Sequence, residues 1–284
     1  MGRLRAGLYG AALGMLALFP QEAMAAARSA CHTWANSVMP ALFPYMVLSQ
    51  LLLSAVRSPA LTAPLAMLGG SPAGARLISL AGYPARKAQR MAALCATTSP
   101  LFILGTLRGG YPMLLAHWLG AFVAWGFASV CVPARDRVVK GAGGHGGPSS
   151  DPGGAKTGRA TLAGAIREAA LAMITVCGCM ALFSVLTALL SKLLPLPPTL
   201  SALLAALLEM AAGCGRIQAL GLPAETAAAL LCAAVSFGGL SVFMQNAVFL
   251  KPLGIDLRAL FAARAVHAAA SGLLCYCLYR SLPI

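Results

Sequence analysis

Charge is scarce in this sequence, and negative charge is the scarcer sign. Only 10% of the 284 residues are charged, with seven Asp and Glu against 21 Lys and Arg. Soluble domains carry about a quarter charged residues, so a water-soluble protein of this length would lack the side chains to cover its surface. Because 59% of the residues are hydrophobic and lipid requires no polar coat, the composition predicts a multi-pass membrane protein.

Motifs of hydrolytic and metal chemistry are lacking as well. The sequence contains no H-E-x-x-H, no G-x-S-x-G, no C-x-x-C and no paired carboxylates. Its nine cysteines fall mostly in apolar runs, and the two C-x-C pairs are more typical of helix packing than of metal binding. We therefore expect no enzyme, no metal and no cofactor. The basic residues lie between apolar runs, which predicts membrane orientation and no nucleic-acid partner.

Five apolar stretches are long enough to cross a bilayer, which takes about 20 residues. They cover residues 38–56, 111–132, 169–190, 226–250 and 257–279. Three others, 61–80, 91–107 and 199–213, are short or interrupted by Pro, Gly or charge. Interruptions of this kind are typical of re-entrant hairpins and broken helices. The expected fold class is an all-α membrane protein, a polytopic helical bundle with two inverted repeats.

The domain organisation follows from the order of these stretches. Residues 1–36 would form an N-terminal helix, retained rather than cleaved as a signal peptide, and an interfacial segment. Residues 37–134 and 161–284 form two transmembrane halves, each read as span, hairpin, broken span and span. The Gly-rich basic stretch 135–160 is a cytoplasmic linker between them. With the N-terminus inside, 16 basic residues are cytoplasmic and five are not, as the positive-inside rule requires.

Glu209 is the most informative residue for function, because it is an acid in an apolar stretch with no adjacent base. A carboxylate inside a membrane costs roughly 2.5 kcal/mol or more, and such residues face a cavity or a partner. Two readings stay open: a substrate or proton site, or a structural pair with Arg216 or Arg264. His117 and His267, at matching places in the two halves, are read as proton relays or as hydrogen-bond donors between helices.

Two polar or Gly-rich breaks complete the candidate site. Glycines at residues 238 and 239 let the backbone unwind and present its N–H and C=O groups to a ligand, and the Thr-Thr-Ser-Pro sequence at 97–100 has the same potential. The alternative is a kink satisfied by neighbouring helices. The substrate-binding hypothesis comprises Thr97, Thr98, Ser99, Glu209, Ser236, Gly238, Gly239, Ser241 and Gln245.

Five motifs in order carry a family resemblance: PALFPY at 40–45, GYP at 82–84, TSPLFILGT at 98–106, EMAAG at 209–213 and SFGGLSVFMQ at 236–245. Together they resemble the YlbJ-type sporulation integral membrane proteins, which carry the nucleoside-recognition or Gate domain. The resemblance implies a multi-pass protein of the bacterial cytoplasmic membrane that acts in spore formation. The chain departs from the family at Ala85-Arg86-Lys87, where the family has a small-residue pair, and around residues 96–100.

The functional hypothesis is a transporter-like protein of the Gate type, with translocation of a small, nucleoside-like solute. The alternative is a non-transporting membrane scaffold for spore envelope assembly, and a weaker third reading is a gated pore. The expected partners are the lipid bilayer and a small-molecule solute. Membrane protein partners and a homo-oligomer are left open.

Overall fold

The computed structural model describes residues 2–56, 58–95, 97–131 and 160–281. The described residues are helical or lie in turns and short connections, and none of them forms a strand. The expected linker at 135–160 lies outside the described residues except for Ala160. The all-helical class expected from the sequence is confirmed.

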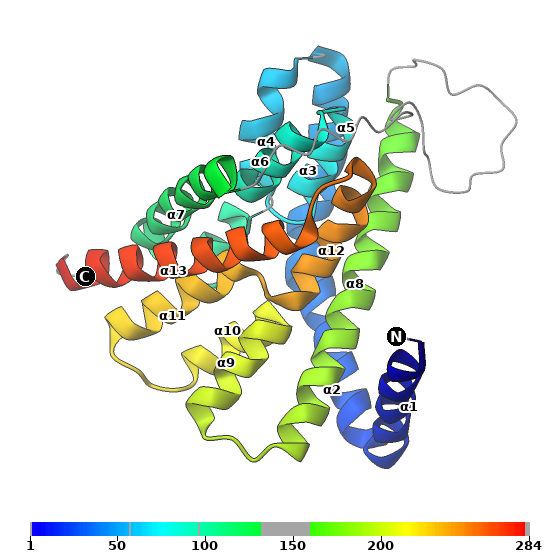
Figure 1. Cartoon of the computed structure of the whole chain (residues 1–284), viewed down its shortest axis with the longest axis vertical. Helices are drawn as coiled ribbons and strands as arrows, with labels where there is room; N and C mark the ends of the chain where they lie inside the picture. The colour runs from blue at the N-terminus through cyan, green and yellow to red at the C-terminus, as the bar shows by residue number, and fades with distance from the viewer. Residues whose placement is uncertain (1, 57, 96, 132–159, 282–284) are drawn as a thin grey trace, which may run out of the picture.

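Thirteen α-helices run through the described residues (Figure 1). Their bounds are α1 (Gly2–Leu18), α2 (Pro20–Thr33), α3 (Met39–Val56), α4 (Thr62–Gly69), α5 (Ala73–Leu80), α6 (Ala85–Cys95), α7 (Gly110–Cys131), α8 (Leu162–Leu193), α9 (Pro198–Leu208), α10 (Met210–Gln218), α11 (Ala224–Phe237), α12 (Gly239–Leu250) and α13 (Leu257–Ser281). Two π-helical turns, Trp34–Val38 and Phe102–Thr106, and two 3₁₀ turns, Pro59–Leu61 and Lys251–Leu253, join some of them.

Five helical runs of the described part are long and apolar enough to cross a membrane: Pro20–Val56, Gly110–Cys131, Leu162–Leu193, Ala224–Leu253 and Leu257–Ser281. They cover the five spans expected from the sequence, except for residue 132 of the second span, which lies outside the described residues. Their outward faces are apolar, with large side chains such as Leu171 and Ile174 of α8 and Phe122 of α7 exposed. Exposed apolar side chains along whole helices are what a lipid environment favours, and the runs indicate a multi-pass membrane protein.

The N-terminal region differs in one respect from the expected boundaries. The segment expected to lie at the interface, up to residue 36, is continuous with the first span, because the π-helical turn Trp34–Val38 joins α2 directly to α3. The helix therefore passes through the boundary at 36–37 without a break, even though Pro40 follows closely. α1 stands at the edge of the molecule beside α2 (Figure 1).

The helix is interrupted in each of the three short or interrupted stretches, and also at Gly238-Gly239. Residues 61–80 form α4 and α5, which pack on each other, and residues 198–218 form α9 and α10, which do the same. Residues 91–107, expected to cross as a broken span, leave the helix after Cys95 and resume helical geometry only beyond Ser99. The break between α11 and α12 lies at Gly238 and Gly239, both with positive φ.

The four breaks meet in pairs at the centre of the molecule. The break between α4 and α5 packs on the first broken segment: the Ser71 N–H donates to the carbonyl of Thr97, and Gly70 lies against the backbone of Thr98 and Ser99. The break between α9 and α10 packs on the α11–α12 break, where Gly239 lies against the backbone of Leu208 and Met210. These pairs form the walls of the site described below.

Long helices surround this centre. α13 packs along both α7 and α11, and α8 runs beside α2, α3 and α12 (Figure 1). Two ion pairs mark the ends of α8: Glu168 pairs with the buried Arg76 of α5, and Lys192 lies 3.0 Å from Glu22 of α2. Glu168 and Lys192 are 24 positions apart in sequence, which corresponds to about 36 Å of helix. A hydrocarbon core is about 30 Å thick, so the two pairs have the spacing of the two membrane interfaces.

Candidate functional site

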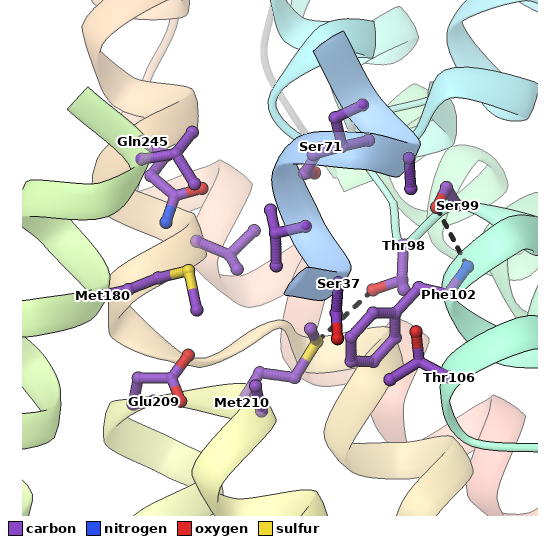
Figure 2. Close-up of a pocket in the computed structure, with 16 residues that line it drawn as sticks. Ser37, Ser71, Thr98, Ser99, Phe102, Thr106, Met180, Glu209, Met210 and Gln245 are labelled. Carbon is purple, nitrogen blue, oxygen red and sulfur yellow. Dashed lines mark hydrogen bonds between the residues drawn. The ribbon is translucent and has the colours of Figure 1, made fainter. Parts of the chain in front are cut away.

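A cavity of about 60 Å³ lies where the broken segments meet. It is bounded by α3, α8, α10, α12 and the segment that follows α6 (Figure 2). Its polar lining is provided by Ser37, Ser71, Thr98, Ser99, Thr106, Glu209 and Gln245. The remaining lining residues are apolar and include Phe102, Met180 and Met210. Figure 2 shows Glu209 and Gln245 on one side of the cavity with Met180 between them, and Thr98 and Ser99 on the other.

Glu209 reaches the cavity because the helix ends beside it. Residue 209 leaves helical geometry (φ −134°, ψ 112°), closes α9 and becomes the N-cap of α10, where its Oε2 accepts the Ala212 N–H at 2.7 Å. The residue is 3% exposed. The helix N-terminus favours a negative charge there, but the backbone N–H groups of Ala211 and Ala212 leave part of the acceptor capacity of the carboxylate unused.

The alternative reading of Glu209, a structural ion pair, is not what the structure shows. Arg216 donates instead to Ser191 and Ser201, at 3.0 and 3.1 Å. Among the described residues, neither Arg216 nor Arg264 forms an ion pair with Glu209. A buried carboxylate without a cation is costly in its charged form. Glu209 is therefore suited to hold a proton, or to meet a donor or cation that enters the cavity.

The two broken helices are joined by Thr98. Its hydroxyl donates to the backbone carbonyl of Val235 at 2.6 Å and lies 3.5 Å from the sulfur of Met210. The neighbouring Ser99 uses its hydroxyl locally, accepting the N–H of Phe102 at 3.3 Å, which starts the next helical turn. Thr98 thus links the first broken segment to α11, and Ser99 stabilises the start of the next helical turn.

Gln245 faces the cavity from α12. Its amide nitrogen donates to the Ser241 hydroxyl one turn earlier, at 3.2 Å, and both residues are buried. Next to it, Asn246 donates to the Ser71 hydroxyl at 3.0 Å, which joins α12 to the break between α4 and α5. The amide of Gln245 is thereby held in place beside the cavity.

The structure brings four of the nine predicted residues to the cavity: Thr98, Ser99, Glu209 and Gln245. The other five lie behind its wall. Ser236 hydrogen-bonds His117 at 2.8 Å, Ser241 supports Gln245, Gly238 and Gly239 form the break, and Thr97 accepts from Ser71 through its carbonyl. These five shape the cavity and do not contact its interior.

Sequence reasoning missed several lining residues. Ser71 follows Gly69 and Gly70 in a stretch already expected to turn, so its place opposite the other break is a signal that was available. Met180 lies in an ordinary apolar stretch, Ser37 lies just before the first expected span, and Thr106 lies near the end of the interrupted stretch 91–107. Nothing in the local pattern separates them from lipid-facing or core positions, because only the tertiary arrangement turns them inwards.

Fold and site together define a class: a multi-pass, all-helical membrane protein with a small, mainly apolar cavity that carries a few polar groups at the meeting point of broken helices. Comparison of the chain with protein-family models, with curated proteins and with solved structures gives no match.

Proposed function

We propose that the protein is a transporter-like integral membrane protein of the nucleoside-recognition or Gate type, which binds a small solute at the central cavity. The observation that carries the proposal is the convergence of Glu209, Gln245, Thr98 and Ser99 on one cavity, from segments up to 147 residues apart in sequence. Broken helices that surround a polar cavity near the bilayer centre are the usual design of substrate sites in secondary transporters.

The two halves would be inverted repeats, and α4–α5 and α9–α10 would be re-entrant hairpins. The order of elements supports this arrangement, since each half holds a long helix, a pair of short helices, a broken segment and a final long helix. The packing supports it too, since each pair of short helices lies with its break against a broken segment. The spans α7 and α13, which close the halves, pack along each other.

The size of the cavity bears on the state of the protein. A volume of about 60 Å³ suffices for a few water molecules, since one needs roughly 10–15 Å³. Pockets for small organic molecules measure about 300–1,000 Å³. We therefore propose that the structure is a closed state, in which a nucleoside-sized solute fits only after the α9–α10 pair and α12 separate.

The cellular setting is part of the proposal. The five motifs that resemble the YlbJ-type family include the two broken segments and Glu209, so the resemblance covers the residues around the cavity. It supports a location in the bacterial cytoplasmic membrane and a role in spore formation. A Glu209 without a cationic partner supports a solute that carries hydrogen-bond donors, as the sugar and base of a nucleoside do.

The test is uptake by the purified protein in liposomes, against labelled nucleosides and a panel of small acids. We expect saturable uptake by the wild type and loss of at least tenfold in Glu209→Gln, because the amide cannot hold a proton or accept as a carboxylate does. Glu225→Gln is the matched control, since Glu225 is half-buried in the first turn of α11, is not part of the cavity lining and should leave uptake unchanged.

Folding of both variants is checked by gel filtration and thermal melting. No uptake across the panel from folded wild type would contradict transport and favour a non-transporting scaffold for spore envelope assembly. Flux without coupling to an ion gradient would instead favour a gated pore. Equal uptake by wild type and Glu209→Gln would remove Glu209 from the site.

A further inference from the structure

Arg264 of α13 is a buried cation that is not part of the cavity lining. Only 4% of the residue is exposed. Among the described residues, its guanidinium takes part in neither of the two ion pairs and in no hydrogen bond. An arginine does not lose its charge in proteins, and a buried charge without a partner is strongly unfavourable. Something outside the described contacts is therefore expected to balance it.

The surroundings of Arg264 are polar and carry no negative charge. Cys95 at the end of α6, His117 of α7 and His267 of α13 are close enough to interact with it electrostatically. The two imidazoles contact each other, with ring centroids 4.8 Å apart. The Nε2 of His267 donates to the carbonyl of His117 at 2.9 Å, so this nitrogen carries the proton in the neutral ring.

Several polar atoms of α7, of α13 and of the segment after α6 are buried and have no partner. They are Thr97 Oγ1, His117 Nε2, His267 Nδ1 and Ser271 Oγ. Buried polar atoms are nearly always hydrogen-bonded, and a group of unpartnered ones indicates a ligand, ion or water. The hydroxyls supply donors, and His117 Nε2 supplies another when its Nδ1 accepts from Ser236, 2.8 Å away.

No carboxylate from the elements around Arg264 is placed to balance its charge. The helices α6, α7, α12 and α13 contain no Asp or Glu, and Glu225 lies half-buried at the start of α11, more than two turns before Ser236. Asp256, just before α13, caps that helix by accepting from the N–H groups of Arg258 and Ala259. The carbonyl end of α6, near Cys95, offsets only part of the burial cost, because a helix-end dipole is a small effect beside it.

We propose that Arg264 binds a small monovalent anion in the protein core, either a halide or the carboxylate of a small organic acid, with the unpartnered donor of His117 on the neighbouring helix α7. Both kinds of anion carry one negative charge and can accept hydrogen bonds from the planar guanidinium group. This inference does not rest on the proposed transport function, since a scaffold would need the same neutralising anion.

The experiment is thermal melting of the purified full-length protein in detergent, in a bulky sulfonate buffer to which chloride, bromide or acetate is added at constant ionic strength. We expect a saturable rise in melting temperature of about 5 °C, the size produced by an anion at roughly 100 times its Kd. The rise should vanish in Arg264→Gln and shrink in Arg264→Lys, which keeps the charge but loses the planar fork. Arg216→Gln, which loses a cation bonded to Ser191 and Ser201, should keep it.

The separate titrations with halides and with acetate distinguish the two kinds of anion. Stabilisation by halides identifies a free inorganic ion, and stabilisation by acetate alone identifies the carboxylate of a solute. No saturable shift with any anion, or an equal shift in Arg264→Gln, would overturn the proposal. If Arg264→Gln does not fold, crystals of the wild type grown in bromide decide: an anomalous peak in contact with the guanidinium supports the site, and its absence refutes it.

Discussion

The hydroxyl of Thr98 donates to the backbone carbonyl of Val235 at 2.6 Å, a hydrogen bond between residues 137 positions apart. Val235 lies in the last turn of α11, where helix ends leave carbonyls without a helical partner. Thr98 satisfies one such carbonyl from the break in the other half of the chain. The hydrogen bond therefore couples the two breaks, and a substitution at one break should alter the stability of the other.

Thr98→Val tests this unit, because it keeps the shape of the side chain and removes the hydroxyl. We expect a loss of about 1–3 kcal/mol in the free energy of unfolding, since the Val235 carbonyl is left buried and unpaired. Thr175→Val is the control, because the Thr175 hydroxyl bonds only the Leu171 carbonyl of its own helix. Thermal melts of the two variants in detergent would contradict the prediction if they shifted equally.

Gly239→Ala should damage the second break. Gly239 has φ +69°, and a Cβ there would lie 3.0 Å from the carbonyl oxygen of Ala206 and 3.1 Å from the Met210 nitrogen. The left-handed conformation alone costs about 1–2 kcal/mol for a residue with a side chain. We expect a lower melting temperature and reduced uptake.

Gly215→Ala is the matched control for that change. Gly215 lies inside α10, and a Cβ there would have no neighbour within 4 Å. Alanine is favoured over glycine in a helix by roughly 1 kcal/mol, so this variant should be as stable as the wild type or more so. A Gly239→Ala protein that melts like Gly215→Ala would mean that the break tolerates a side chain.

Glu168→Gln should destabilise the protein more than Glu22→Gln, although each removes one ion pair. Arg76 is buried, with a side chain 8% exposed. It loses the one charged partner that it has among the described residues, while keeping the amide of Gln50 at 2.8 Å. We expect a cost of about 1–3 kcal/mol, below that of a fully buried pair because Glu168 is half-exposed. The exposed Glu22–Lys192 pair should matter little. Melting curves that rank the two variants in the reverse order would contradict this.

Cys31 of α2 and Cys177 of α8 should form a disulfide under mild oxidation. Their sulfur atoms are 3.9 Å apart across two neighbouring helices, and both cysteines are free. Peptide mapping by mass spectrometry after copper-phenanthroline treatment should recover the linked pair. Cys179→Ser should not affect it, whereas Cys31→Ser abolishes it. Recovery of Cys31 linked to another cysteine instead would mean that α2 packs differently against α8.

Much of the architecture could be predicted because lipid imposes simple requirements. A long apolar run has to be a helix where no water can pair its backbone, so the five spans follow from length and composition. Glu209 stands out as an acid in an apolar stretch, and Gly238-Gly239 and Ser99-Pro100 mark breaks because these residues disfavour continuous helix. Four of the residues chosen on those grounds line the cavity.

The remaining features depend on contacts between distant segments, which local patterns do not encode. Nothing around Ser37 or Met180 shows that these helix positions face the cavity, and nothing near Arg216 shows that it bonds two serines rather than Glu209. The local sequence also does not predict that α2 continues into α3. Pro40 favours a helix start, but a π-helical turn just before it carries the chain through.

The ion pairs at the two ends of α8 set a preferred lipid length for this protein. Charged groups about 36 Å apart along a helix fit a bilayer somewhat thicker than the average, and in a thinner one α8 would have to tilt or the lipid to stretch around it. Reconstitution in short-chain phosphatidylcholine should therefore strain the Arg76–Glu168 and Glu22–Lys192 contacts together. Acyl-chain length is thus a variable to control before any flux from this protein is compared between laboratories or between membranes.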